Sequence, residues 1–178
     1  AVALDDVEIE VDVPTLSATA ASRRWHGRID SLERISDDVM RVRIALPDGE
    51  RVAFIAGQYI NIVLEGGQRR AFSFANAPHD DAFIELHLRN YGGTFSQHVF
   101  GKLKERDILR FQAPLGTFFL REESSKPIVL LASGTGFAPI KALVEHLIHL
   151  KSTRPVSLYW GGRRPADLYM NALCEEWA

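Results

Sequence analysis

Cysteine is nearly absent from this 178-residue sequence, in which Cys174 is the single thiol. One cysteine excludes an internal disulfide framework and any cysteine-ligated zinc or iron–sulfur site within the chain. Apolar runs such as Ile128–Ala132 reach only five residues, far too few for a membrane-spanning helix. Basic residues are not in excess, because 21 Lys and Arg stand against 23 Asp and Glu. We therefore expect a cytoplasmic protein with no nucleic-acid partner and no membrane contact.

The composition is that of an ordinary globular protein, with 46% apolar and 25% charged residues. The opening segment alternates around Val7–Val13 and then becomes small and polar. It predicts a linker or N-terminal connector over residues 1–22. Because the chain begins without Met and without a secretory signal, we expect it to be a piece of a longer protein.

Residues 25–120 alternate apolar and polar side chains with a period of two. Val42, Ile44 and Leu46 show the pattern first, and it returns at residues 59–64 and 83–89. Turn residues separate these segments, as expected of antiparallel strands with one buried face. Because closure removes exposed sheet edges, we predict an all-β, six-stranded antiparallel barrel over residues 23–122. One short helix, beginning near Thr94 or Ser96, should interrupt it.

The pattern changes after residue 125. The run Ile128–Ala132 predicts a strand covered on both faces, and apolar residues between Ile140 and Ile148 recur at helical spacing. A second strand at residues 156–160 follows, and then a second helix opened by Pro165. Two parallel strands cannot cover their own apolar faces. Residues 125–178 are therefore predicted to be a partial, truncated α/β doubly wound nucleotide-binding domain.

The turn Ser133–Pro139, with the sequence Ser-Gly-Thr-Gly-Phe-Ala-Pro, lies between the predicted strand and helix. Glycines there let the backbone approach a phosphate, and the helix N-terminus supplies amides and the positive end of its dipole. The pattern is neither G-x-G-x-x-G nor a P-loop, and Leu131 excludes a nucleophile elbow around Ser133. The alternative is a plain strand-to-helix turn with a proline in the first helical turn.

Two further segments suit an anionic ligand. Arg70 and Phe72 share one face of a strand within Arg-Arg-Ala-Phe-Ser-Phe-Ala-Asn, and such a pair can hold a phosphate and a flat ring. The alternative is an edge strand with solvated arginines. Residues 87–96 bring together Arg89, two glycines and the start of a helix that Thr94 or Ser96 is expected to cap. This fits either a pyrophosphate site or a glycine turn with an N-cap.

In this order, with Gly57-Gln58-Tyr59 before and Gly161-Gly162-Arg163-Arg164 after, the motifs resemble the ferredoxin–NADP reductase superfamily. More narrowly, residues 25–178 are similar to the flavin reductase portion of CDP-6-deoxy-glucoseen reductases and of the reductase components of aromatic-ring oxygenases. The resemblance implies a flavin-binding barrel followed by part of an NAD(P)-binding domain. The cofactors it implies are FAD, with FMN as an alternative, and NADH or NADPH.

The resemblance also implies a role for each matching residue. Arg70 would pair with a flavin phosphate, Phe72 would pack on the isoalloxazine, and Ser73 would hydrogen-bond near flavin N5. Ser73 is therefore the catalytic candidate. The other implied cofactor-binding residues are Tyr59; His87, Leu88 and Arg89 on the phosphate and adenosine side; Gly92, Gly93, Thr94 and Ser96 around the phosphates; Gly134, Thr135, Gly136 and Pro139 in the nicotinamide-nucleotide turn; and Arg163 near the nucleotide's ribose or phosphate.

Three positions depart from the family's pattern. Phe72 lacks the phenolic hydroxyl that many relatives carry, and Arg106 stands where relatives often have glycine. Cys174 lies in a helical context and does not replace the family's C-terminal Cys-Gly-Pro-type segment. No metal is expected, since His146 and His149 lack a third ligand.

The implied function is an NAD(P)H-dependent flavin oxidoreductase. It would pass electrons from nicotinamide through flavin to an iron–sulfur acceptor, a two-iron ferredoxin-type domain or protein. No side chain has to act as a nucleophile or metal ligand, because the cofactors carry the chemistry. Two alternatives stay open: a free-flavin reductase that releases reduced flavin, and a flavin-binding module without turnover.

Overall fold

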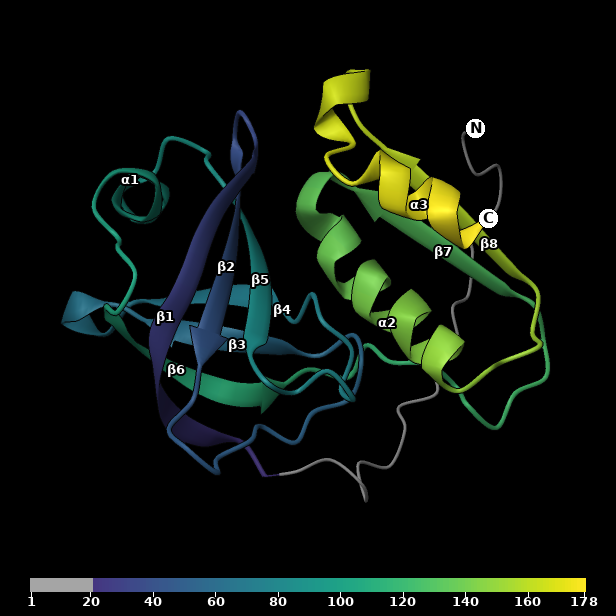
Figure 1. The fold of residues 1–178 in the computed structure, drawn as a ribbon, viewed down its shortest axis with the longest axis horizontal. Coiled ribbons are helices and arrows are strands. Elements are labelled where there is room, and N and C mark those ends of the chain that lie inside the picture. Colours follow the sequence, from purple (N-terminus) through teal and green to yellow (C-terminus); the bar gives the residue numbers. More distant parts are fainter. Residues whose placement is uncertain (1–20) are drawn as a thin grey trace, which may run out of the picture.

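The computed structural model describes residues 21–178, so the connector predicted at residues 1–22 lies almost entirely outside the described residues. Its first part is a six-stranded antiparallel sheet with strand order β4-β3-β6-β1-β2-β5. Figure 1 shows these strands wrapped around a common interior, and we call this unit the barrel. The strands are β1 (Arg23–Ser36), β2 (Val39–Ala45), β3 (Tyr59–Val63), β4 (Arg69–Ser73), β5 (Ile84–Arg89) and β6 (Ile108–Leu115).

The barrel interior confirms the predicted period of two. Val42 and Ile44 in β2 are fully buried, and Arg43 between them lies on the other face. The edge strands β4 and β5 meet just past the end of β4, where the amide of Ala75 donates to the carbonyl of Glu85 over 2.8 Å. The predicted short helix is present as α1 (Thr94–Gly101), which follows β5 and packs Val99 against the core.

The second part of the chain is a small α/β region. Strands β7 (Ile128–Ser133) and β8 (Val156–Gly161) pair in parallel, and α2 (Phe137–His149) connects them. Helix α2 lies between this strand pair and the barrel (Figure 1), and α3 (Asn171–Trp177) follows β8. Two short 3-10 turns complete the region, η2 (Gly134–Gly136) and η3 (Pro165–Asp167).

Strand β7 is covered on one face only within the described residues, although its continuous apolar run predicts cover on both. Val129 and Leu131 are 63% and 71% exposed, whereas Leu130 is buried against α2. The difference arises because both α2 and α3 pack on the face that carries Leu130. The opposite face of the strand pair therefore presents apolar side chains at the surface.

The sequence pattern predicts that the second helix of this region begins at Pro165, but in the structure it begins at Asn171. Pro165 opens only the turn η3, because the Asp167 carboxylate accepts bonds from the backbone and guanidinium of Arg163. Leu168 then leaves the helical conformation at φ −88° and ψ 64°. A proline at a helix-start position therefore marks a single turn here, since a local carboxylate closes it.

Candidate functional site

A cleft of about 440 Å³ opens where β4, β5 and the start of α1 face the glycine turn of the α/β region. It brings together three motifs that lie far apart in the sequence. We call it the flavin-side cleft, and its lining residues are Arg70, Ala71, Phe72, Ser73, His87, Arg89, Tyr91, Gly93, Thr94, Phe95, Ser96, Thr135, Gly136, Ala138 and Pro139.

One wall of the cleft comes from β4. Because β4 is an edge strand, residues from both of its faces reach the cleft, so Ser73 lines it together with Arg70 and Phe72. The Arg70 guanidinium donates only to oxygens of its own segment, at 2.9 and 3.3 Å, and forms no ion pair within the described residues. The Phe72 ring lies 5.5 Å from that of Phe95. This wall offers a cation, aromatic surface and a hydroxyl.

The start of α1 forms the second wall. Gly92 has φ +77°, a left-handed conformation that favours glycine, and its amide donates to Asn90 Oδ1 over 2.9 Å. The prediction that Thr94 or Ser96 caps the helix is wrong: Gly93 is the N-cap residue and no side chain caps it. The Ser96 hydroxyl instead donates to the Gly93 carbonyl. The uncapped first turn therefore keeps amides for an anionic group.

Strand β5 places alternate residues in different surroundings. Leu88 enters the barrel core and is 3% exposed, so its side chain does not line the cleft, contrary to its predicted position. His87 lies on the other face, with Nδ1 3.0 Å from the Tyr169 hydroxyl and Nε2 3.2 Å from Glu85 Oε1. Both ring nitrogens are occupied by protein partners. His87 therefore borders the cleft as a fixed wall.

The protonation states of Glu85, His87 and Tyr169 follow from their burial and from the charges around them. Burial would raise the pKa of Glu85, but the hydrogen bonds from His87 and Arg43 and the positive charge of Lys141 outweigh it and lower the pKa to about 2. Burial lowers the pKa of His87 and raises that of Tyr169. A neutral His87 therefore donates a hydrogen bond from Nε2 to Glu85 and accepts one at Nδ1 from the Tyr169 hydroxyl.

Arg89 is the most constrained cation of the site. Its Nε donates to Asp38 Oδ2 over 2.7 Å, and its Nη2 lies 3.5 Å from Asp167 Oδ1. Nη2 is buried and has no hydrogen-bond partner within the described residues. The φ of +51° at Gly134 favours glycine, and a Cβ there would lie 2.7 Å from Arg89 Nη1, so the guanidinium would have to shift. Arg89 lines the cleft, so its positive charge would attract an anionic group there, although Nη2 itself is buried beside Asp167.

A second cleft of about 570 Å³ adjoins the first and shares Arg89 and Tyr91 with it. It lies at the carboxyl ends of β7 and β8, where open α/β sheets bind ligands. Gly134 and Arg163 of the predicted set line this cleft, and the 74% exposed Arg163 side chain pairs with Asp167 at 3.0 Å. Tyr59 lines neither cleft, but it pairs with Ser73 across β3 and β4.

Two family descriptions match this chain in succession. Residues 26–120 match the oxidoreductase FAD-binding domain, and residues 130–178 match the oxidoreductase NAD-binding domain. The chain belongs to the ferredoxin–NADP reductase-like family of FAD- and NAD-binding oxidoreductase domains. The sequence prediction of this family and of its FAD and NAD cofactor classes is thus confirmed.

Relatives of this family cover nearly the whole chain. The CDP-6-deoxy-L-threo-D-glycero-4-hexulose-3-dehydrase reductase of Yersinia pestis is 40% identical over 177 residues, which are 99% of this chain and 53% of the relative. Reductase component 1 of the terephthalate 1,2-dioxygenase of a Comamonas species is 39% identical over 158 residues, 88% of this chain and 47% of that one. The chain spans about half the length of these relatives.

Solved structures agree on the fold. The Amycolatopsis cytochrome P450 reductase GcoB superposes with a TM-score of 0.83 at 35% identity, over 90% of this chain and 49% of GcoB. Phthalate dioxygenase reductase gives a TM-score of 0.76 at 23% identity, over 86% of this chain and 49% of that protein, which supports the fold alone. The predicted six-stranded antiparallel unit followed by a small α/β region is therefore confirmed.

The residues of the flavin-side cleft fit an FAD-type group. Arg70, which forms no ion pair within the described residues, Arg89 and the uncapped first turn of α1 all line one cleft. Positive charge and helix N-terminal amides at a concave surface match a ligand that carries phosphates. Phe72 and Phe95 add the apolar surface that a flat ring needs.

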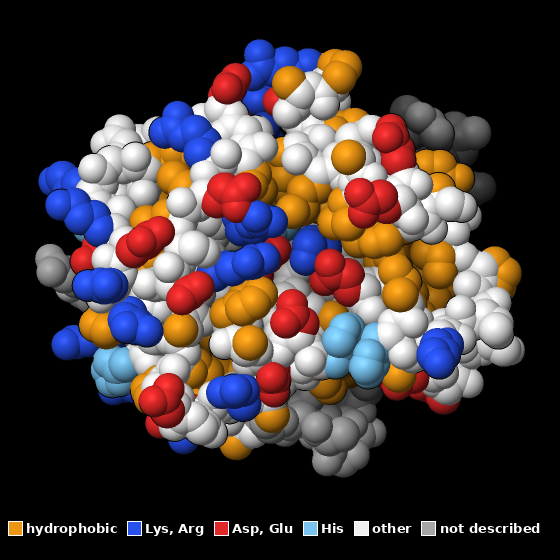
Figure 2. Space-filling view, in the orientation of Figure 1, with side chains coloured by type: hydrophobic (Ala, Val, Ile, Leu, Met, Phe, Trp, Pro, Cys, Tyr) orange, Lys and Arg blue, Asp and Glu red, His pale blue; other side chains and the backbone are white. Residues whose placement is uncertain are grey.

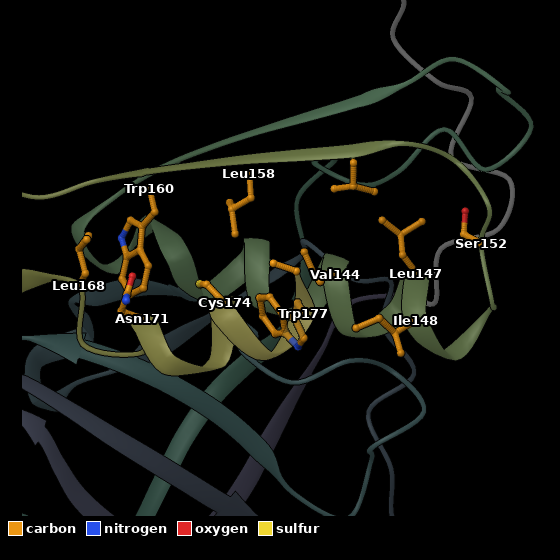
Figure 3. Close-up of a pocket in the computed structure, with 12 residues that line it drawn as sticks. Val144, Leu147, Ile148, Ser152, Leu158, Trp160, Leu168, Asn171, Cys174 and Trp177 are labelled. Atoms are coloured by element: carbon orange, nitrogen blue, oxygen red, sulfur yellow. The ribbon is translucent and has the colours of Figure 1, made fainter.

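A third cavity, of about 430 Å³, lies inside the α/β region and is apolar. Figure 3 shows Leu158 and Trp160 of β8 opposite Val144 and Leu147 of α2, with Trp177 of α3 between the elements. No charged side chain lines it within the described residues.

Residues 21–178 contain no group of three or more His, Cys, Asp or Glu side chains arranged to hold a metal. Among the helices described in that range, none is both long and apolar enough to cross a membrane.

Sequence reasoning missed the partners that hold the site together: Asp38, Glu85, Lys141, Asp167 and Tyr169. One signal was present, because Lys141 stands within the apolar face of α2, where a lysine needs an acid nearby. For Glu85 there was no signal, since alternating polar residues on a strand are typical of a solvent-exposed face.

Proposed function

We propose that this chain is the flavin- and nucleotide-binding part of an NAD(P)H-dependent reductase that serves an iron–sulfur acceptor, a two-iron ferredoxin-type domain or protein. A single cleft carries the proposal, because it is lined both by barrel residues of the flavin motifs and by the glycine turn of the α/β region. Relatives named as dioxygenase reductase components support the class of acceptor. The cytoplasmic location expected from the sequence stays a prediction.

We further propose the division of the chain and the roles of its cleft residues. Residues 23–122 would bind flavin, residues 125–178 would form part of the NAD(P)-binding domain, and residues 1–22 would connect to what precedes. When bound, the two cofactors supply hydride transfer from nicotinamide C4 to flavin N5 and onward one-electron transfer. The chain's own residues bind, orient and exclude water.

Each wall has one task in this proposal. Flavin phosphates are bound by Arg70 and by the start of α1 with the turn before it: Gly92, Gly93, Thr94 and Ser96. Phe72 packs on the flavin ring. Thr135, Gly136 and Pro139 face them from the nucleotide side of the same cleft, and Gly134 and Arg163 extend that side into the second cleft. His87 serves as a wall and not as a phosphate ligand, since both of its nitrogens are engaged.

Ser73 is the side chain proposed to act directly on the reaction. Its hydroxyl makes no hydrogen bond within the described residues and lines the cleft beside Phe72. A hydroxyl so placed can donate to a ring nitrogen of a flavin packed on the aromatic wall. The hydrogen bond would orient the ring and stabilise charge that develops during reduction.

A free-flavin reductase is the second candidate. The NAD(P)H-flavin reductase of Aliivibrio fischeri is 32% identical over 154 residues, 83% of this chain and 64% of that protein. The two candidates differ in how firmly flavin is held. Gel filtration of the flavin-loaded protein separates them, because an electron-transfer reductase retains its flavin and a free-flavin reductase loses it.

The test of the proposal begins with the purified chain, FAD and either nicotinamide nucleotide under anaerobic conditions. Bleaching of the flavin absorbance at 1:1 stoichiometry is the expected result. Absence of flavin binding contradicts the proposal, and binding without bleaching favours a flavin-binding module without turnover. The chain supplies a matched pair of variants, since Arg69 and Arg70 are adjacent and only Arg70 lines the cleft. Arg70→Gln should weaken FAD binding by about tenfold or more, and Arg69→Gln by less than about twofold.

A further inference from the structure

The outer face of β5 carries three polar side chains at every second position, and each one contacts the α/β region. Glu85 contacts Lys141 in α2, His87 contacts Tyr169, and Arg89 contacts Asp167 in η3. We call Glu85, His87 and Arg89 the β5 seam. Figure 2 shows basic and acidic side chains close together in the middle of the molecule, between the barrel and the α/β region.

The contact at Glu85 is fully buried. Its side chain is 2% exposed, and Lys141, 9% exposed, lies 3.4 Å from Oε1. Lys141 also donates to the Ala75 carbonyl over 3.0 Å and pairs with Glu145 at 2.8 Å. Because Ala75 follows β4 and Glu85 is in β5, this one ammonium group joins α2 to both edge strands of the barrel.

The contact at His87 leads to the glycine turn. Tyr169 meets the ring of Phe137, the first residue of α2, edge-on at 6.1 Å, and that of Trp160 at 5.0 Å. Trp160 Nε1 in turn donates to the Gly134 carbonyl over 3.0 Å. A single side chain thus connects the wall of the cleft at His87 to the residues that hold the turn in place.

These contacts matter because no strand ladder joins the two described parts of the chain. The six-stranded and two-stranded sheets share no pairing in residues 21–178, yet the flavin-side cleft takes its walls from both. Its width therefore depends on side-chain contacts across the boundary. Arg89 reaches the glycine turn directly at Gly134, and the His87–Tyr169 bond reaches it through Trp160.

We propose that Tyr169 is a positioning residue that, through its hydrogen bond to His87, sets the distance between the nucleotide turn and the flavin wall. This inference rests on the proposed function, since it assigns the bond a part in hydride transfer. A shift of about 1 Å between reacting groups can cost orders of magnitude in rate. Tyr169 itself touches no reacting atom in this assignment.

The test compares Tyr169→Phe with Tyr159→Phe. Both variants lose one hydroxyl, but Tyr159 projects from the exposed face of β8 and is 61% exposed. In flavin-loaded protein, Tyr169→Phe should slow flavin reduction at saturating nucleotide by about fivefold or more. Its flavin dissociation constant and its half-saturating nucleotide concentration should change by less than about twofold. Tyr159→Phe should leave all three quantities unchanged.

A second measurement uses the protein without added cofactor. Amide hydrogen exchange in segments 84–89 and 134–139 should be about fivefold faster in Tyr169→Phe than in the original protein, with β1 and β2 unchanged. If both exchange and the saturating rate match those of the original protein, the inference is overturned. If the original protein shows no flavin reduction, the proposed function fails, and the exchange measurement still decides whether Tyr169 holds the boundary.

Discussion

The two glycines of the turn Gly134-Thr135-Gly136 should respond in opposite directions to the same substitution. Gly134 has φ +51°, and a Cβ there would lie 2.7 Å from Arg89 Nη1. Gly136 has the helical φ of −59°, and a Cβ there would meet nothing within 4 Å. Because the substitution is the same at both positions, any difference in its effect comes from the backbone conformation and the neighbouring side chain.

The expected magnitudes follow from these surroundings. A left-handed residue with a Cβ costs about 1–2 kcal/mol, and displacing Arg89 from its bond to Asp38 adds about 1 kcal/mol. Since alanine loses less chain entropy than glycine on folding, about 0.5 kcal/mol is regained. We expect Gly134→Ala to lower the free energy of unfolding by about 2 kcal/mol and Gly136→Ala to raise it by about 0.5 kcal/mol.

Equilibrium urea unfolding at pH 7, followed by tryptophan fluorescence and circular dichroism, measures both variants against the original protein. The double variant Gly134→Ala with Arg89→Ala separates the two costs of Gly134→Ala. Its unfolding free energy, compared with that of Arg89→Ala alone, should retain only the backbone part. Equal effects of alanine at positions 134 and 136 would refute the reasoning, because they would show that neither φ nor Arg89 decides the cost.

Three other outcomes are expected. Arg106 and Lys151 have φ +75° and +51°, so glycine at either position should raise the free energy of unfolding by about 0.5–1 kcal/mol in urea titrations, and a loss of stability would contradict this. Burial lowers the pKa of both His79 and His87 from 6.5. The stability that comes from their neutral forms is therefore present above pH 6.5 and lost as the pH falls below that value. The melting temperature should decrease from pH 7 to pH 5, and a melting temperature that does not change with pH would contradict this expectation. Ser73→Ala should slow anaerobic flavin reduction by about tenfold with unchanged FAD affinity, and an unchanged rate removes the assigned role.

Local patterns were sufficient for the elements that carry the site. The alternation at Val42 and Ile44 and the helical spacing from Ile140 to Leu147 predict elements that the structure contains, because one apolar face repeats at the period of the backbone. The turns at Gly92 and Gly134 could be predicted for a related reason. Both glycines have positive φ angles, a backbone conformation that favours glycine.

The cap of α1 and the start of the last helix were predicted wrongly. Both depend on competition between hydrogen-bond partners within a few residues. The Ser96 hydroxyl donates to the Gly93 carbonyl, and the Asp167 carboxylate accepts a hydrogen bond from the Arg163 amide. Residue preferences describe the average outcome of such competition and not its result in one loop.

Sequence alone determined the two kinds of sheet, through the period of their apolar residues, and the order of its motifs carried the resemblance that identified the family. Tertiary structure decided what those motifs touch. His87 was placed against a cofactor by its motif, yet its ring is held by Tyr169, 82 residues further along the chain. Glu85 has the spacing of a solvent-facing residue and is buried beneath Lys141. The alternating pattern shows which residues share a face of a strand. Only the packing of a distant element determines whether that face meets water or protein.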